Sequence, residues 1–415
     1  MRITMLAIGS TGDVRPLILL GQELTYRGHQ VTLAAFSDFQ DAVTGAGLSF
    51  YPLSGNARGF MQSVLSPETD SLTYLPRLIK ELRPVVSHLI QDMDDSCRDA
   101  EAMICNFFGS VFYSIAEKHR IPCVQVLYCP MDPNRTMPLP VVSSQTLPSW
   151  INSASYRLGY LLIGLVEKHY LTPWRRENHL DLRRVRTSPD YRAGDREALV
   201  IYAFSPHVVP RAPEWGGNIH MSGFWLDEHP VAWTPPESLI RFLDAGDPPV
   251  YIGFGSMNGG DMKELMSIVR QAVQRASLRA VINLGWGGGE QSSSGECYFA
   301  RSIPHSWLFP RVQAVVHHGG AGTTAAGLSH GKPTLVIPFS GDQPFWGYHV
   351  HRLNCGPKPL PREKLNPDQL ADALRELTTR PEYGQSAEKL SLLLRDEHGL
   401  ATAADLIEKE ITENR

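Results

Sequence analysis

One supersecondary pattern occurs twice in this sequence and constrains the fold more than any other feature. Each copy contains an apolar strand, a glycine- and serine-rich turn, an amphipathic helix and a second apolar strand. Gly28 follows the first helix, where a left-handed residue commonly ends a helix. Continuous apolar strands that alternate with helices are typical of parallel sheets covered on both faces, so we predict an α/β fold. The segments are residues 3–8, 14–27 and 31–36 in the first copy and residues 249–254, 261–276 and 280–284 in the second.

The length of the chain and one proline-rich stretch predict two doubly wound domains. The chain has 415 residues, which is too long for one ordinary hydrophobic core. Residues 225–236 lack clear periodicity and contain three prolines, so they are the best candidate for a linker. We therefore expect an N-terminal domain in residues 1–224, a second domain in residues 237–397, and a helix in residues 398–415 that can pack back on the first domain. Such sheets bind ligands at the carboxyl ends of their strands, so the two domains would face a central cleft.

Charge, hydropathy and cysteine usage exclude several classes of function. The net charge of −4 gives no electrostatic footprint for nucleic acid. No apolar run is long enough for a transmembrane helix, although peripheral contact with a membrane stays open. The N-terminus lacks a signal-peptide cleavage site and enters a glycine turn, which favours a first strand. Six cysteines without Cys-x-x-Cys spacing indicate neither a zinc site nor a disulfide framework, so we expect a cytoplasmic protein.

The strongest chemical motif is the segment of residues 314–328, in which a short apolar strand leads through three glycines into a helix. Free amide groups and the positive end of the dipole at a helix start favour an anion. His318 beside the turn can donate to a phosphate oxygen, and Thr323 can add a hydroxyl group. The alternative is a tight strand-to-helix turn in which His317 and His318 are structural.

A second polar pair follows the next apolar strand. Asp342 and Gln343 come after Pro338, in the loop beyond that strand. A carboxylate beside a carboxamide offers acceptors and donors together, which suits recognition of sugar hydroxyl groups. The alternative is an ordinary surface loop.

The first turn, residues 9–16, does not predict a dinucleotide site. The third glycine of the G-x-G-x-x-G pattern is missing, and no acidic residue ends the second strand. Asp13 lies at the tip of the first strand, where a general base could face the cleft. Its alternative role is to cap the following helix.

Together these motifs resemble the inverting family 1 glycosyltransferases of the GT-B fold, and the resemblance covers nearly the whole chain. The greatest similarity is to the sterol 3-beta-glucosyltransferases and related bacterial natural-product glycosyltransferases. Five motifs in the family's order carry the resemblance: Gly-Ser-x-Gly-Asp at 9–13, Phe-Gly-Ser at 254–256, Trp-Leu-Phe-Pro at 307–310, His-His-Gly-Gly-x-Gly-Thr at 317–323 and Gly-Asp-Gln-Pro at 341–344.

The resemblance implies a role for each matching residue. Asp13 would be the catalytic base, at the place where many relatives have a histidine. Asp342 and Gln343 would bind the hydroxyl groups of the donor sugar. Ile303 would present backbone groups to the nucleobase, next to Ser302. The residues implied for the donor diphosphate are Ser256, His318, Gly320, Gly322 and Thr323.

Two positions depart from the pattern of the plant members. Those enzymes stack uracil on a tryptophan where this chain has Ser302, so stacking must come from elsewhere, with Trp286 as a candidate. They also bind the ribose through a glutamate where this chain has Ala326. The preference for UDP over dTDP therefore follows from the resemblance to the sterol enzymes.

The expected activity is transfer of glucose from UDP-glucose to a hydroxyl group of a lipophilic acceptor such as a sterol. A polyketide or macrolide acceptor, an epimerase or hydrolase reaction, and a non-catalytic nucleotide-binding relative are the alternatives. No Asp-x-Asp motif occurs in a donor loop, so we expect no metal ion and no cofactor beyond the nucleotide sugar. The candidate acceptor residues, Phe60, Phe107, Phe108 and Met131, are apolar residues of the N-terminal domain, a kind of residue that belongs to a core more often than it contacts a ligand.

Overall fold

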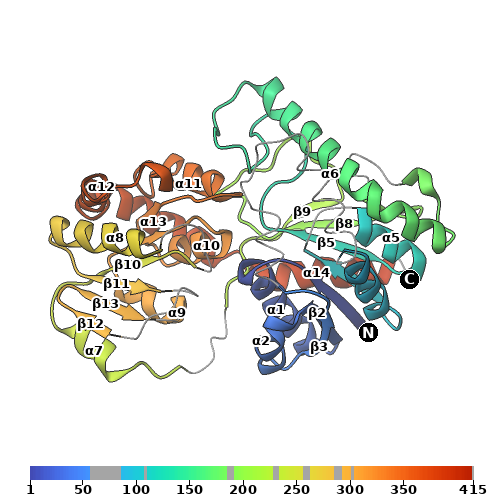
Figure 1. Ribbon diagram of the computed structural model, residues 1–415, viewed down its shortest axis with the longest axis horizontal. Helices are drawn as coiled ribbons and strands as arrows, with labels where there is room; N and C mark the ends of the chain where they lie inside the picture. The colour runs from blue at the N-terminus through green and yellow to red at the C-terminus, as the bar shows by residue number, and fades with distance from the viewer. Residues whose placement is uncertain are drawn as a thin grey trace.

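The computed structural model describes residues 1–56, 86–106, 110–184, 191–227, 233–255, 262–284, 292–300 and 303–413. The chain forms two α/β halves that lie side by side, each built on its own sheet (Figure 1). Both sheets have helices on their faces, and the halves are Rossmann-like, as the sequence predicts.

The N-terminal half contains a seven-stranded parallel sheet in the order β3-β2-β1-β4-β5-β8-β9. From β1 the sheet extends to β2 and β3 on one side, and from β4 it extends to β5, β8 and β9 on the other. The turns that follow β1 and β4 therefore lie next to each other. The strands are β1 Arg2–Ala7, β2 Gln30–Phe36, β3 Ser49–Leu53, β4 Ala102–Cys105, β5 Cys123–Leu127, β8 Leu199–Tyr202 and β9 Ile219–Met221, and the main helices are α1 Thr11–Tyr26, α2 Gln40–Gly45, α5 Ser110–His119 and α6 Ser149–Glu177.

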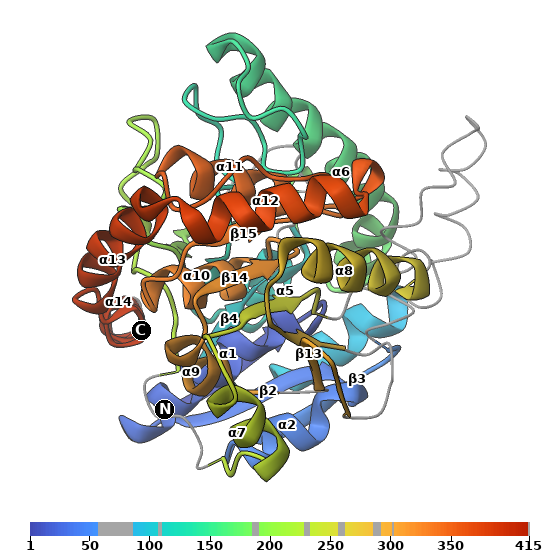
Figure 2. The same ribbon diagram turned by 90° about the vertical axis from the view of Figure 1, so that its left-hand side faces the viewer.

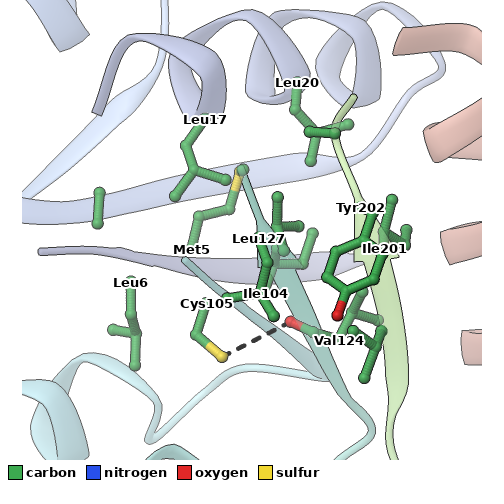
Figure 3. Packing of buried hydrophobic residues seen from close by; sticks show 14 of the residues in the cluster. Met5, Leu6, Leu17, Leu20, Ile104, Cys105, Val124, Leu127, Ile201 and Tyr202 are labelled. Carbon is green, nitrogen blue, oxygen red and sulfur yellow. Dashed lines mark hydrogen bonds between the residues drawn. The ribbon is translucent and has the colours of Figure 1, made fainter. Parts of the chain in front are cut away.

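Helix α1 shows how the sequence specifies this half. Its buried face includes Leu17 and Leu20, which pack toward Met5 of β1 above a core from β4, β5 and β8 (Figure 3). Our expectation that the helix starts at residue 14 is wrong, because the Ser10 side chain caps the helix and lets it begin at Thr11. Gly28 has a φ of 90°, which confirms the left-handed residue predicted after the helix.

The C-terminal half contains a six-stranded sheet in the order β12-β13-β11-β10-β14-β15, parallel except for β12. Its order reverses between β10 and β14, where Gly253 pairs with His317. The strands are β10 Val250–Gly253, β11 Ala280–Asn283, β12 Ser292–Ser294, β13 Cys297–Ala300, β14 Ala314–His317 and β15 Thr334–Val336, and the helices are α7 Glu237–Asp244, α8 Met262–Ala276, α9 His305–Leu308, α10 Ala321–Ser329, α11 Gln343–Arg352, α12 Pro367–Thr379 and α13 Pro381–Arg395.

Alternate residues of β10 belong to two separate hydrophobic clusters. Val250 and Ile252 pack into one cluster with α8 and α12, whereas Tyr251 packs into the other with α7 and α9. The sheet is therefore buried on both faces, as the unbroken apolar runs predict.

The last helix, α14 (Gly399–Glu413), leaves the C-terminal half and packs on α1 of the other half (Figures 1 and 2). Arg27 at the end of α1 donates to Asp405 at 2.5 Å and to Glu408 at 2.9 Å. His29 contacts the other oxygen of Glu408 at 2.9 Å. The chain thus crosses between the halves a second time, after α13.

All six cysteines are free thiols. Within the described ranges, none of the helices combines the length and hydropathy that crossing a bilayer requires.

Candidate functional site

Asp13 closes the first turn of α1 with one of its two carboxylate oxygens. Oδ2 accepts from the Ser10 amide at 2.7 Å and from the Ser10 hydroxyl at 2.9 Å. This is a capping box in which Ser10, and not Asp13, is the N-cap residue. Burial raises the pKa of Asp13, and the two bonds from Ser10 partly oppose that rise. The expectation that Asp13 itself would be the N-cap is therefore wrong: Asp13 supports the cap from the first turn of the helix. Every described hydrogen bond to its carboxylate goes to Oδ2, and its role as the base stays a prediction.

Two side chains from neighbouring strand ends hold the main chain of Asp13. Asn106, directly after β4, donates to the Asp13 carbonyl at 2.9 Å, and its own oxygen accepts from the Ile8 amide at 3.1 Å. Tyr128, directly after β5, donates to the same carbonyl at 3.0 Å. Sequence reasoning missed both residues, although each is a polar residue at the carboxyl end of a buried strand, which is the signal that could have found them.

The glycine turn after β14 presents the open start of α10. Gly320 is the N-cap residue, and no side chain caps the helix. The first intrahelical bond runs from the Thr324 amide to the Gly320 carbonyl at 2.9 Å. The amides of residues 321–323 come before this bond, so they have no acceptor within the helix. They are the donors that an anion at the helix start would meet.

His318 lies between two glycines that leave room for its ring. A Cβ on Gly320 would lie 2.7 Å from His318 Nε2, and a Cβ on Gly255, whose φ is 62°, would lie 2.9 Å from its Cε1. Nδ1 is buried without a hydrogen bond of good geometry, although the ring lies close enough to the Gly253 backbone for that group to oppose the fall in its pKa. Burial lowers the pKa of His318 to about 4, so the ring is neutral at physiological pH and can offer one N–H group.

His317 has a structural role, which agrees with the alternative considered for it. Its side chain is fully buried, and Nδ1 accepts from the Gly319 amide at 2.9 Å. The other ring nitrogen therefore carries the proton. Desolvation holds the pKa of His317 far below its usual range, so His317 fixes the turn without adding charge.

Asp342 and Gln343 lie at the predicted edge of the sheet, the same edge as the glycine turn. They are not in a loop as expected, because Asp342 is the N-cap and Gln343 the first residue of α11. Asp342 accepts from the indole N–H of Trp346 at 2.8 Å. The Gln343 carbonyl oxygen accepts from the amides of Phe339 at 2.7 Å and Ser340 at 3.2 Å, so it holds the preceding loop. Burial raises the pKa of Asp342 to about 6, and the negative charge of Asp13 adds to the rise.

Helix α1 contacts α10 of the other half, which brings Asp13 to the side of the site where Asp342 lies. Burial raises the pKa of the Cys129 thiol, after β5, and the charges of Asp342 and Asp13 add to the rise. Burial lowers the pKa of His305, in the C-terminal half, to about 3, and the charge of Arg15 in α1 adds to this shift. Residues far apart in the sequence therefore converge where the carboxyl ends of the two sheets meet.

The predicted nucleobase and acceptor residues are only partly described. Ile303 is buried in the same cluster as Phe309, so its side chain serves the core, and the contact of its backbone with the nucleobase stays a prediction. Met131 is 6% exposed and packs in the N-terminal core, which agrees with its alternative role. The remaining predicted residues, Ser256, Ser302, Trp286, Phe60, Phe107 and Phe108, lie outside the described residues.

In the part of the chain that the structure describes, no three histidine, cysteine or acidic side chains gather closely enough to hold a metal ion.

Family models match a part of each half. Residues 3–130 match the glycosyltransferase family 28 N-terminal domain. Residues 294–399 match the C-terminal domain of the erythromycin biosynthesis protein CIII-like family. The chain is 35% and 32% identical to two sterol 3-beta-glucosyltransferases of Arabidopsis thaliana over 99% of its length, and it spans 66% and 68% of those proteins. It is 32% identical to the sterol 3-beta-glucosyltransferase of Candida albicans, of which it spans 28%.

Solved structures share the fold over the whole chain. The calicheamicin glycosyltransferase CalG4 superposes with a TM-score of 0.73 at 17% identity, with 99% of this chain and 98% of that one covered. The glycosyltransferase of kitacinnamycin gives a TM-score of 0.68 at 19% identity, with 99% of both chains covered. These likenesses show the two-domain GT-B fold. With the sequence identity to the plant enzymes, they lead to one conclusion: the chain belongs to the family of GT-B glycosyltransferases that contains the sterol 3-beta-glucosyltransferases.

Proposed function

We propose that the chain transfers glucose from UDP-glucose to a hydroxyl group of a sterol or a similarly lipophilic acceptor, with inversion at the anomeric carbon. The names of its relatives support this reaction. The observation that carries the proposal is the contact between α1, which holds Asp13 in the N-terminal half, and α10, whose open start lies in the C-terminal half on the same side as Asp342. A base on one side and an anion site on the other are what an in-line transfer between two bound substrates requires.

The donor would lie along the edge of the C-terminal sheet. The amides of residues 321–323, the His318 ring and the Thr323 hydroxyl would bind the diphosphate, with Ser256 reaching it from the other side. Asp342 and Gln343 would bind the sugar hydroxyl groups. The backbone at Ile303 would hold the nucleobase, and the resemblance adds Ser302 and Trp286 as candidates for this subsite.

The acceptor hydroxyl would attack the anomeric carbon from the face opposite the nucleotide. Its proton passes to Asp13 as the new bond forms, while the bond between the anomeric carbon and the diphosphate oxygen breaks. Negative charge grows on the leaving diphosphate, and the preorganised amides of α10 with His318 stabilise it. The raised pKa of Asp13 favours this step, because a carboxylate with an ordinary pKa is a weak base near neutral pH. The reaction then needs no metal ion and no further cofactor.

A screen of donors against acceptors, read by mass spectrometry, tests this proposal. We expect a glucosylated sterol with UDP-glucose and no product without the enzyme. Release of free glucose or of an epimer in the absence of any acceptor would instead support a hydrolase or an epimerase. The free thiols suit a reducing compartment, and we place the activity in the cytoplasm.

A natural-product acceptor with a dTDP-sugar is the second candidate. The match of residues 294–399 to the erythromycin-type C-terminal domain favours it, because that segment includes the predicted diphosphate and sugar sites. The same screen separates the two, since dTDP-glucose and UDP-glucose would give products with different acceptors.

A further inference from the structure

Exposed apolar side chains concentrate on one helix of the N-terminal half. Ten large hydrophobic residues are exposed in the described part of the chain, and five of them lie on α6. A sixth, Val141, lies in the loop that precedes the helix. Their exposed fractions are 71% for Trp150, 58% for Leu158, 44% for Leu161, 50% for Leu162 and 54% for Leu165. A concentration of this kind on a soluble fold marks an interaction surface.

These five residues lie on one face of a helix that is firmly held on its other side. The spacing of three and four residues between Leu158, Leu161, Leu162 and Leu165 brings them together along α6. On the inner side, Tyr156 and Tyr160 are buried, and their hydroxyl groups donate to the carbonyls of Pro138 and Met131. The outer face is therefore a fixed feature of the fold. Figure 1 shows α6 along the outer margin of the N-terminal half.

The charges along this face are basic. Arg157 and Lys168 are exposed, and neither has an ion-pair partner among the described residues. The only carboxylate between Trp150 and Lys168 is Glu167, which points inward. Both of its oxygens accept from the Ser110 amide, at 2.9 and 3.0 Å. An apolar strip flanked by unpaired cations complements a bilayer with anionic headgroups.

We propose that the outer face of α6, formed by Trp150, Leu158, Leu161, Leu162 and Leu165 with Arg157 and Lys168, docks the chain on the surface of an anionic bilayer. Glu167 links this face to the start of α5, which follows the carboxyl end of β4 on the acceptor side of the site. Docking through α6 would therefore place the acceptor side of the N-terminal half close to a reservoir of lipophilic acceptor. This last step rests on the proposed function, whereas the docking itself does not.

Co-sedimentation of the full chain with vesicles tests the docking without donor or acceptor. The probes are vesicles of phosphatidylcholine alone and of a three-to-one mixture with phosphatidylserine. We expect binding to the mixed vesicles that weakens with salt. Leu161→Ser combined with Leu165→Ser should lower the affinity by about tenfold or more. Arg157→Glu combined with Lys168→Glu should cause a loss of about tenfold on the mixed vesicles and little change on phosphatidylcholine.

Helix α13 provides a matched control. Leu392 and Leu393 are exposed leucines of comparable exposure, 56% and 48%, on a helix of the other half. Their replacement by serine should leave vesicle binding unchanged. Thermal denaturation of every variant shows whether the fold is intact, and the charge-reversal pair tests the surface independently of the leucines.

Three results would overturn the proposal. One is that the wild-type chain binds neither kind of vesicle. Another is that the α13 control variant loses as much vesicle binding as the α6 variants. The third is a wild-type dimer that the α6 variants dissociate, because the face would then bind a second copy of the chain. Failure of the proposed reaction gives a different result: vesicle binding would persist while no glucosylated product forms. If both hold, the α6 variants should lose turnover of a sterol held in vesicles but keep turnover of the same sterol in detergent.

Discussion

Replacing Asp13 with asparagine removes the proposed base while keeping the shape of the turn that holds it. The asparagine oxygen can still accept from the Ser10 amide and hydroxyl, which now donate to Oδ2 at 2.7 and 2.9 Å. Asn106 and Tyr128 bind the main-chain carbonyl, which the substitution does not change. The position of residue 13 should therefore survive, and its ability to take a proton should not.

The expected losses differ for catalysis and for stability. A general base contributes about 10²- to 10⁴-fold to rate, so kcat should fall by that factor, or about 3 to 5.5 kcal/mol in activation free energy. The substitution weakens a charged capping interaction by about 0.5 to 1 kcal/mol. It also removes a carboxylate whose pKa is raised by burial, which offsets that loss because the ionised form is costly to desolvate. The free energy of unfolding should change by less than about 1 kcal/mol.

Three measurements examine this prediction: transfer rate by mass spectrometry, UDP affinity by calorimetry, and thermal denaturation. Asp41→Asn is the matched control, because Asp41 is an exposed carboxylate in the first turn of α2 and should keep full activity. If Asp13→Asn retains kcat within tenfold of the wild type, Asp13 is not the base. If its UDP affinity falls in parallel with its rate, Asp13 holds the fold of the site instead.

Three further predictions concern the donor site and the last helix. Truncating His318 to alanine should weaken UDP binding and kcat/KM together by about 10- to 100-fold, because a hydrogen bond to a charged phosphate is lost; unchanged kinetics would remove His318 from the diphosphate site. Affinity for UDP-glucose should fall as the pH drops through about 6, where Asp342 takes up a proton, and Asp342→Asn should flatten that dependence; a profile that keeps its slope in the variant would refute the assignment. Arg27→Ala should lower stability by about 1 kcal/mol and expose α14 to proteolysis without changing kcat, because its bonds to Asp405 and Glu408 join α14 to α1.

The sequence predicts the two sheets well because their strands are continuous apolar runs. β10, β11, α8 and α14 all begin and end within two residues of the predicted segments. The start of α1 differs because capping depends on side-chain geometry: Ser10 and Asp13 bond each other across the first turn, which moves the helix start to Thr11. The domain boundaries, at residues 225–236 and after residue 397, remain predictions.

The site is less predictable, because it depends on contacts between segments far apart in the chain. The sequence identifies the glycine turn and Asp342, since each follows a buried strand. It does not reveal that Asn106 and Tyr128 meet at the Asp13 carbonyl, which follows from the strand order β1-β4-β5. Nor does it reveal that Trp346, one helical turn further along α11, orients the Asp342 carboxylate. The roles of the donor and acceptor residues stay predictions.

A crystal structure of the protein soaked with UDP tests the central claim most directly. The account predicts that the terminal phosphate lies within hydrogen-bonding distance of the amides of residues 321–323 and of the His318 ring. Density for UDP at any other place on the chain, with the start of α10 left to solvent, would contradict it.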